Sequence, residues 1–281
     1  VSYRTALTYS YNVPAIKVAM KYGTEKTIKL AKRLGITTLV EDDDNPAMAV
    51  GGLTHGVTPL EMAGAYAGIA NMGKFNKPTP IIKILDRNGK VLYEHKTNPT
   101  QAVKPESAYM MISMMEDVMT RGTGRGAAIS RPCAGKSGTT DNYHDAWFVG
   151  FTPNLACAVW IGDDNNESLG GMTGGGQPAT LWRAFMSDAL DGIPAEDFEK
   201  PDGFKMPAPK YEAPKPQPKK QTTKKQDTKK KDSKKEDALP GGGNVPQPPR
   251  SGKSSTPLPQ LRRGFFCQGV RVNGQSTMAQ C

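Results

Sequence analysis

Four parts of the chain have helix-like sequence, and in residues 24–34 the apolar positions roughly follow the 3.6-residue period of a helix with one buried face. These parts cover residues 15–20, 24–34, 58–72 and 105–120. The third begins with a threonine followed by proline and, soon after, glutamate, which is a favourable start for a helix. The fourth is rich in methionine, which we interpret as packing in a hydrophobic core.

Strand-like patterns follow in the second half of this region. Residues 146–151 and 155–161 are apolar runs joined by Thr-Pro-Asn, which predicts an antiparallel hairpin. An Asp-Arg-Asn-Gly turn within residues 80–94 predicts another hairpin. A glycine-rich loop at 170–176 precedes a last predicted helix at 178–190. This order predicts an α+β fold, with an antiparallel sheet flanked by helices.

The composition changes after residue 192. The formal net charge is +10, and nearly all of it lies in residues 193–281, which are also rich in proline. Residues 219–235 hold many lysines and no apolar side chain, so they cannot bury enough surface to offset the entropy of ordering. We therefore predict a domain over residues 1–192 and a Lys/Pro-rich disordered tail over 193–281. No stretch reaches the ~18 apolar residues that span a bilayer.

The cysteines and histidines do not suggest a metal site. The four cysteines lack C-x-x-C spacing and the three histidines are far apart, so we expect no metal and no cofactor. Cys133 and Cys157 lie in apolar, strand-like runs and are predicted to be small core residues. Cys267 and Cys281 either close a disulfide loop or remain free thiols.

Two short polar motifs could carry chemistry. The first is Lys136-Ser137-Gly138-Thr139-Thr140, at the end of a strand-like run. Its ammonium and hydroxyls could form a small anion site, and its glycine would let a ligand approach the backbone. Taken alone, it could equally be an exposed strand end.

The second motif is Ser10-Tyr11-Asn12, at the entrance of the first predicted helix. Taken alone, Ser10 and Asn12 could simply cap that helix. Ser-x-Asn followed about 125 residues later by Lys-Ser-Gly matches the second and third of three motifs that mark penicillin-binding proteins and class A β-lactamases.

Longer strings carry the same resemblance. They include Gly-Val-Thr-Pro-Leu-Glu-Met-Ala at 56–63, Gly-Thr-Gly at 122–124 and Asp-Ala-Trp-Phe-Val-Gly at 145–150. Over about residues 1–190 the chain resembles the transpeptidase domain of class A (bifunctional) penicillin-binding proteins. The resemblance implies that family's fold and its acyl transfer from D-Ala-D-Ala stem peptides, which cross-links peptidoglycan. It also implies acylation by β-lactams.

The resemblance implies roles for single residues. Ser10, Asn12 and Lys136 would be catalytic: Ser10 would relay a proton toward the leaving amine and Asn12 would hydrogen-bond the peptide. Lys136 would also hold the terminal carboxylate of the substrate, together with the hydroxyl groups that follow it. The substrate-binding set is Ser137, Gly138, Thr139 and Thr140.

The first motif of the family, Ser-x-x-Lys, is missing, because no serine of this chain is followed three positions later by lysine. We therefore expect the nucleophile, a glycosyltransferase domain and a membrane anchor upstream of Val1, in a protein located outside the cytoplasm. The chain alone is expected to be inactive, and its fold to be incomplete at the N-terminus.

Two alternatives remain. One is a related serine D,D-carboxypeptidase or β-lactamase. The other is a non-catalytic, wall-associated module that binds anionic wall polymers through its basic tail. Nucleic acid is not an expected partner, since no aromatic side chain between Glu212 and Gly264 is present to stack on bases.

Overall fold

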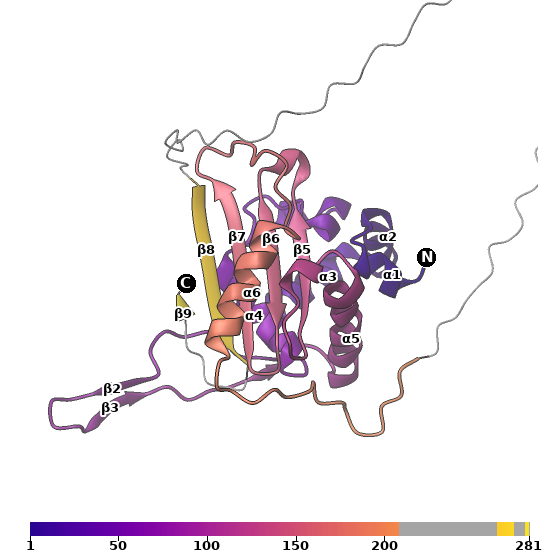
Figure 1. Cartoon of the computed structure of the whole chain (residues 1–281). Helices are drawn as coiled ribbons and strands as arrows, with labels where there is room; N and C mark the ends of the chain where they lie inside the picture. Colours follow the sequence, from indigo (N-terminus) through magenta and orange to yellow (C-terminus); the bar gives the residue numbers. More distant parts are fainter. Residues whose placement is uncertain (208–262, 273–278, 281) are drawn as a thin grey trace, which may run out of the picture. The chain divides into compact units, whose positions relative to one another are not determined.

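The structure, a computed structural model, describes residues 1–207, 263–272 and 279–280 (Figure 1). The α-helices of these residues are α1 (Tyr3–Thr8), α2 (Asn12–Tyr22), α3 (Thr24–Arg33), α4 (Pro59–Ala70), α5 (Pro105–Arg121) and α6 (Gln177–Ala189). Short 3-10 helices are η1 (Glu41–Asp43), η2 (Pro46–Val50), η3 (Arg125–Ala127) and η4 (Asp141–Tyr143). The strands are β1 (Lys74–Phe75), β2 (Lys83–Leu85), β3 (Val91–Glu94), β4 (Thr100–Gln101), β5 (Ala134–Thr139), β6 (Ala146–Phe151), β7 (Leu155–Asp163), β8 (Arg263–Arg271) and β9 (Ala279–Gln280).

The main sheet has the strand order β5-β6-β7-β8-β9, and every neighbouring pair is antiparallel. Helix α4 packs on one face of the sheet and α6 on the other, while α5 lies along β5 (Figure 1). This is the predicted α+β arrangement. Strand β5 forms one edge of the sheet, which leaves its outer side open to the helices α1 and α2.

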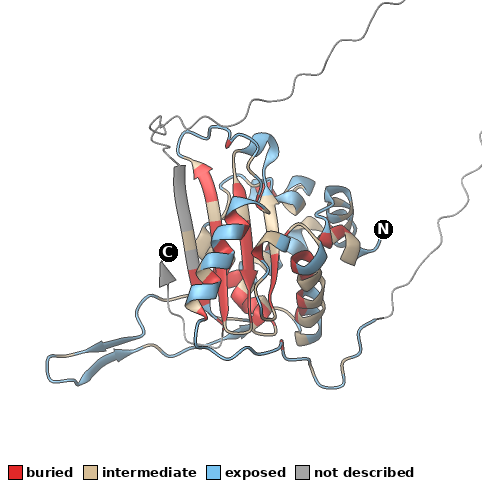
Figure 2. Ribbon diagram, viewed as in Figure 1, coloured by how far each residue is buried: buried red, intermediate tan, exposed pale blue. Residues whose placement is uncertain are grey.

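Strands β6 and β7 are buried along most of their length (Figure 2), and because successive side chains point to opposite faces, each face of the sheet has its own core. On β6, Val149 and Phe151 point toward α4, whereas Phe148 points toward α6 and meets the fully buried Trp182 at a ring distance of 5.5 Å. The indole N–H of Trp182 donates to the carbonyl of Gly150 at 3.3 Å. A Cβ atom at Gly150 would lie 2.9 Å from the Trp182 ring, so this close approach requires glycine.

Several predicted elements are confirmed. The helix predicted at 58–72 is α4, and Thr58 and Glu61 form a capping box at its start. The methionine-rich helix is α5, in which Met115 and Met119 are buried as predicted, whereas Met111 is exposed on the outer side of the helix. The predicted hairpin at 146–161 is β6–β7, with β7 extending two residues further, to Asp163.

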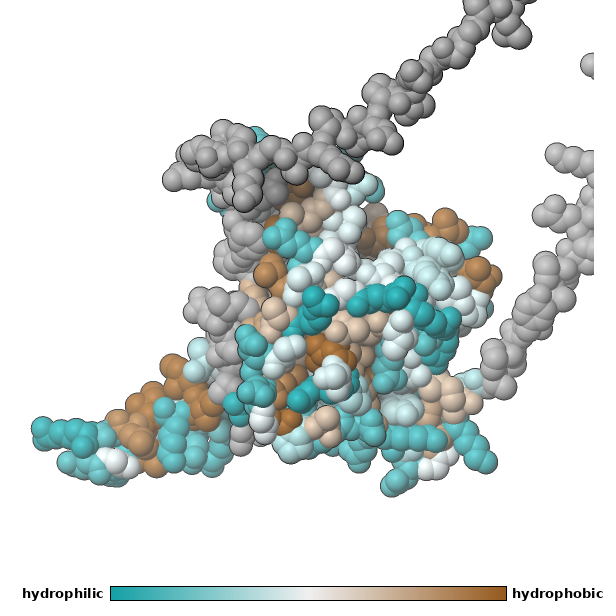
Figure 3. Space-filling model, viewed as in Figure 1, coloured by the Kyte–Doolittle hydropathy of each residue, from teal (hydrophilic) through white to brown (hydrophobic). Residues whose placement is uncertain are grey.

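The hairpin predicted at 80–94 is β2–β3, and it projects from the body of the fold (Figure 1). Its side chains are exposed on both faces, including Ile84, Leu85 and Leu92. In Figure 3 the projecting hairpin carries hydrophobic surface, in brown, behind a hydrophilic tip.

Two described parts of the predicted tail are ordered, contrary to our expectation of disorder over 193–281. Phe198 is 9% exposed and packs on Phe151 at a ring distance of 5.6 Å. Strand β8 pairs with the whole of β7, from Leu155 opposite Arg271 to Asp163 opposite Arg263. The physical reason is that β7 is apolar on both faces and would otherwise expose unpaired backbone groups at an edge. Residues 208–262 of the predicted tail lie outside the described residues, and the division of the chain at residue 192 stays a prediction.

The structure confirms the predictions for two cysteines and tests only one end of the predicted disulfide loop. Cys133 and Cys157 are buried free thiols, as predicted. Cys267 is disulfide-bonded. Cys281, the other end of the predicted loop, lies outside the described residues. None of the helices in the described part of the chain is long and apolar enough to span a membrane.

Candidate active site

The structure brings the two predicted motifs together at the β5 edge of the sheet. Nζ of Lys136 donates a hydrogen bond of 2.7 Å to Oγ of Ser10, although the two residues are 126 positions apart. The same ammonium donates to the carbonyl of Ser137 at 2.8 Å. We call these two side chains the Ser10–Lys136 pair.

Ser10 lies in the turn between α1 and α2, and its φ of 58° is in the left-handed region. That conformation costs a non-glycine residue about 1 kcal/mol or more and persists only where the surroundings fix it. Helix α1 is fixed from the other side, because Arg4 donates to the carbonyl of Ser113 at 2.7 Å and to Asp117 at 2.9 Å on α5. The left-handed backbone of Ser10 belongs to the end of α1, because the N–H of Ser10 donates to the carbonyl of Leu7 at 3.2 Å and that of Tyr11 to the carbonyl of Ala6 at 2.9 Å, which is the Schellman pattern of a helix C-terminus.

The capping interpretation of Ser10 and Asn12 is wrong. The N-cap of α2 is Tyr11, and no side chain caps this helix. Asn12 is the first residue of α2 and is exposed. The Ser10 hydroxyl accepts from Lys136 instead of from the helix backbone.

Burial lowers the pKa of Lys136 from its ordinary value of 10.5 to about 8. Desolvation disfavours the charged ammonium, and the two oxygen atoms that accept its hydrogen bonds are both neutral. An amine with this pKa can gain and lose a proton near neutral pH. It can therefore exchange a proton with the Ser10 hydroxyl beside it or, when charged, attract an anion.

The hydroxyl groups that follow Lys136 occupy the opposite face of β5 or its end. Ser137 is half-buried and shares a hydrogen bond of 2.6 Å with the hydroxyl of Thr123. Thr139 is exposed and accepts from the backbone N–H of Gly174 at 3.1 Å. Thr140 accepts from the backbone N–H of Asp145 at 2.7 Å, which closes the loop that contains η4.

A scan against protein families matches residues 1–187 to the penicillin-binding protein transpeptidase domain. The chain belongs to the penicillin-binding protein transpeptidase family. Two thirds of the chain carry this match, and it includes both predicted motifs. The predicted resemblance to class A members is also confirmed by the curated relatives.

Penicillin-binding protein 2D of Bacillus subtilis is 39% identical over 207 residues, which cover 70% of this chain and 29% of the relative. Penicillin-binding protein 1A of Aquifex aeolicus is 36% identical over 203 residues, covering 72% and 27%. The chain thus spans less than a third of the length of these relatives.

Solved structures agree with the transpeptidase fold. The PonA1 protein of Mycobacterium tuberculosis in complex with penicillin V has a TM-score of 0.64 and 29% identity, covering 71% of this chain and 59% of that one. Penicillin-binding protein 1A of Haemophilus influenzae has a TM-score of 0.63 and 27% identity, covering 71% and 36%.

The sequence analysis missed the contacts of the 122–124 turn, which follows α5. Thr123 donates from its backbone to the carbonyl of Thr8 at 3.3 Å, two residues before Ser10, and its hydroxyl binds Ser137. A Cβ atom at Gly122 would lie 2.3 Å from that same Thr8 carbonyl. The turn therefore contacts the chain next to both members of the Ser10–Lys136 pair. The sequence analysis used its Gly-Thr-Gly sequence only as part of the family resemblance and assigned it no contact.

The glycine-rich loop at 170–176 also lies against the site. A Cβ atom at Gly174 would lie 2.0 Å from the carbonyl of Trp147 and 2.3 Å from that of Gly138, so the loop backbone packs directly on β5 and β6. A Cβ atom at Gly175 would lie 2.4 Å from the carbonyl of Thr123. The loop, which we interpreted as a connection to the last helix, thus holds the end of β5.

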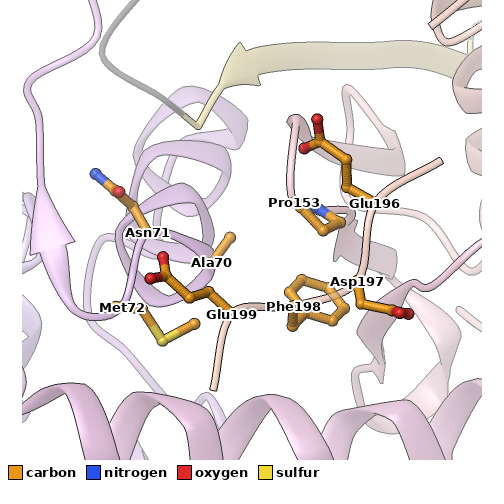
Figure 4. A pocket seen from close by; sticks show the side chains of 8 residues that line it. All are labelled: Ala70, Asn71, Met72, Pro153, Glu196, Asp197, Phe198 and Glu199. Carbon is orange, nitrogen blue, oxygen red and sulfur yellow. The ribbon is translucent and has the colours of Figure 1, made fainter. Parts of the chain in front are cut away.

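A small cavity of about 130 Å³ lies elsewhere, between the end of α4 and the β6–β7 turn (Figure 4). Residues from the segment after α6 form one side of it, and none of the predicted site residues lines it. The cavity is therefore separate from the Ser10–Lys136 pair. Its lining residues are Ala70, Asn71, Met72, Pro153, Glu196, Asp197, Phe198 and Glu199.

Proposed function

We propose that this chain is the C-terminal part of a peptidoglycan D,D-transpeptidase that works through an acyl-serine intermediate. The observation that carries the proposal is the 2.7 Å contact between Lys136 and Ser10, in a chain of the transpeptidase family. It supports a proton-transfer site rather than a helix cap, because the Ser10 hydroxyl is bound by an amine whose pKa is about 8.

In the proposed reaction, a nucleophilic serine attacks the amide carbon of a D-Ala-D-Ala stem peptide. The serine proton passes to the lysine of its Ser-x-x-Lys motif, the amide bond breaks, and D-Ala leaves with its amine taking a proton that Ser10 relays from Lys136. The amine of a neighbouring stem peptide then attacks the ester, which forms the cross-link and frees the serine. Asn12, which is exposed two residues after Ser10, would hydrogen-bond the peptide side chain.

The substrate carboxylate would bind at the end of β5. Lys136 would supply positive charge, and the hydroxyl groups of Ser137, Thr139 and Thr140, on the other face and at the end of the strand, would supply hydrogen bonds. Thr139 is exposed, and its bond to the N–H of Gly174 uses its oxygen as an acceptor, so its own proton is free to point toward an anion. Gly138 leaves the backbone of β5 open to the ligand.

The nucleophile and its Ser-x-x-Lys motif would come from a preceding part of a longer protein, because no serine of this chain has the required lysine. The relatives leave room for this, since the chain spans 29% and 27% of the first two. A glycosyltransferase domain, a membrane anchor and a place outside the cytoplasm are part of the same proposal. Stem peptides and β-lactams are the proposed ligands, and the relative in complex with penicillin V supports the second.

Fluorescent penicillin tests the proposal in membranes of the cells that make the protein. An antibody against this chain should detect a penicillin-labelled band well above 30.3 kDa, the mass of the chain. An antibody-reactive band that carries no label would contradict the proposal and favour a binding module. A labelled band at 30.3 kDa would place the nucleophile within the chain, with Ser10 examined first.

The fate of the label separates a transpeptidase from the serine hydrolases named as alternatives. A β-lactamase releases the acyl group to water quickly, so its label would fade within the assay. The proposed transpeptidase keeps the label and transfers a stem-peptide acyl group to an added amine. Release of free acid with no amine product would indicate a carboxypeptidase.

A further inference from the structure

Two sulfur atoms meet in the core on the α6 face of the sheet, away from the Ser10–Lys136 pair. Cys157 lies on β7 with no exposed surface and is a free thiol. Cys267 lies on β8, is half-buried and is disulfide-bonded. The Sγ atoms of these two residues are 3.4 Å apart.

The strand register places both side chains on the same face. Cys157 pairs with Gly269, and Cys267 pairs with Val159, so the two cysteines are diagonal neighbours across β7 and β8. A Cβ atom at Gly269 would meet the Phe185 ring at 3.1 Å, which shows how closely α6 covers this point. The sulfurs therefore meet in a packed apolar layer between the sheet and α6.

The donor in this sulfur–sulfur hydrogen bond is identified by the chemistry of the two cysteines. Cys267 carries no proton because its sulfur is bonded in a disulfide, so the thiol of Cys157 is the donor. A thiol in contact with one sulfur of a disulfide is the arrangement that precedes thiol–disulfide exchange.

We propose that Cys157 exchanges with the disulfide of Cys267, which gives a second covalent form of the protein in which a Cys157–Cys267 bond joins β7 to β8. In this step the Cys157 thiolate attacks Sγ of Cys267. The new sulfur–sulfur bond forms, and the bond from Cys267 to its present partner breaks. The partner leaves as a thiolate and takes up the proton that Cys157 lost. No oxidant or reductant is consumed, because one disulfide and one thiol are present before and after.

Burial makes this exchange slow at neutral pH. It raises the pKa of the Cys157 thiol well above its ordinary value, so the reactive thiolate is scarce. Below that pKa, the thiolate fraction and the exchange rate rise about tenfold for each pH unit. This steep dependence distinguishes exchange by a buried thiol from exchange by an exposed one, which levels off near pH 8.5.

The test maps disulfides in the full chain after incubation at pH 7, 8 and 9. Acid stops the exchange, unfolding in acid exposes the thiols for blocking, and trypsin is then added without reductant. The four cysteines fall on four different tryptic peptides, so each link is identified by mass. We expect a linked pair of peptides 137–183 and 264–271, appearing about tenfold faster per pH unit. If Cys267 keeps its original partner at pH 9 and Cys157 is recovered only as a blocked thiol, the proposal is wrong.

Cys133 provides the matched control. It is also a buried thiol with a raised pKa, but it directly precedes β5, and β6 and β7 separate that strand from β8. Cys133→Ala should leave the rate of the new link unchanged, and Cys157→Ala should abolish that link while the original one remains. Links from Cys133 and Cys157 to Cys267 in equal amounts would show random exchange and overturn the proposal.

Discussion

The two sides of the main sheet show the same physical effect with opposite chemical results. On the β5 side, burial lowers the pKa of Lys136 to about 8. On the β8 side, burial raises the pKa of the Cys157 thiol. Both shifts follow from one rule, since a poorly hydrated environment always disfavours the charged form. Burial therefore brings the pKa of the amine toward neutral pH, where the amine can transfer protons, and moves the pKa of the thiol further above neutral pH.

The two sites also differ in how they are held. The Ser10–Lys136 pair lies where α1, α2 and the 122–124 turn meet the edge of the sheet, and it depends on polar contacts and close backbone approaches. The two sulfurs lie within an apolar layer, where the register of β7 and β8 brings them together. The predictions that follow test the first site, where we expect the larger functional effects.

The largest effect is expected from Lys136→Ala in the longer protein. Loss of a general acid–base group costs roughly 10²–10⁴-fold in rate, so penicillin labelling of the antibody-reactive band should slow by at least about 100-fold. Lys83→Ala is the matched control, because Lys83 lies on the exposed β2–β3 hairpin and contacts Glu94 at 3.5 Å. Equal labelling of both variants would exclude a role for Lys136 in acylation.

Gly122→Ala should destabilise the chain and separate the 122–124 turn from Thr8. The added Cβ atom would lie 2.3 Å from the Thr8 carbonyl, and such overpacking costs about 1–3 kcal/mol. Denaturant unfolding measures the loss. In the control Gly68→Ala, the nearest atom is a movable methyl group of Leu34 at 3.3 Å, so the free energy of unfolding should stay the same or rise. An equal loss of unfolding free energy in both variants would show that the close approach to the Thr8 carbonyl is not the cause of the destabilisation.

The pH dependence of stability gives a smaller effect with a defined sign. Between about pH 8 and 10.5 the unfolded chain keeps the proton that folded Lys136 has lost. The contribution of Lys136 to the free energy of unfolding therefore rises with pH in this window, by on the order of 2 kcal/mol. Unfolding curves of the original chain and of Lys136→Met should converge or cross as the pH rises. A constant difference between them would show that the pKa of Lys136 is not lowered.

Thr123→Val should give the smallest effect. It removes the hydroxyl that binds Ser137 at 2.6 Å while keeping the shape of the side chain. The loss should be about 1 kcal/mol in the free energy of unfolding, and up to about tenfold in the labelling rate of the longer protein. Thr123→Ser keeps the hydroxyl and should restore the labelling rate. Failure of serine to restore it would show that the methyl group, not the hydroxyl, positions Ser137.

The sequence predicted what depends on local pattern and motif order. Two apolar runs joined by Thr-Pro-Asn in residues 146–161 predicted the β6–β7 hairpin, and the capping signal at Thr58 predicted the start of α4. The order of the two short motifs, read through the family resemblance, predicted that Ser10 and Lys136 act at one site, and the structure places them in contact.

Contacts that exist only in three dimensions escaped the sequence analysis. The Thr123–Ser137 bond joins a turn to a strand across the site, and no sequence spacing encodes it. The left-handed backbone of Ser10 lies in the Schellman turn that ends α1, a position that glycine usually marks and serine does not. Strand β8 was not predicted, because the composition of residues 193–281 as a whole is dominated by lysine and proline. The short segment that pairs with β7 has a different composition from the rest of that region.

Locating the acylated residue is the most direct test of the proposed transpeptidase. The penicillin-labelled, antibody-reactive protein is purified, digested, and its acylated peptide is sequenced by mass spectrometry. We predict that the penicilloyl group is on a serine of a Ser-x-x-Lys motif that precedes Val1, in a protein that also contains residues 1–192. Acylation of Ser10, or a protein that contains this chain and is never acylated, would contradict the roles proposed for Ser10 and Lys136.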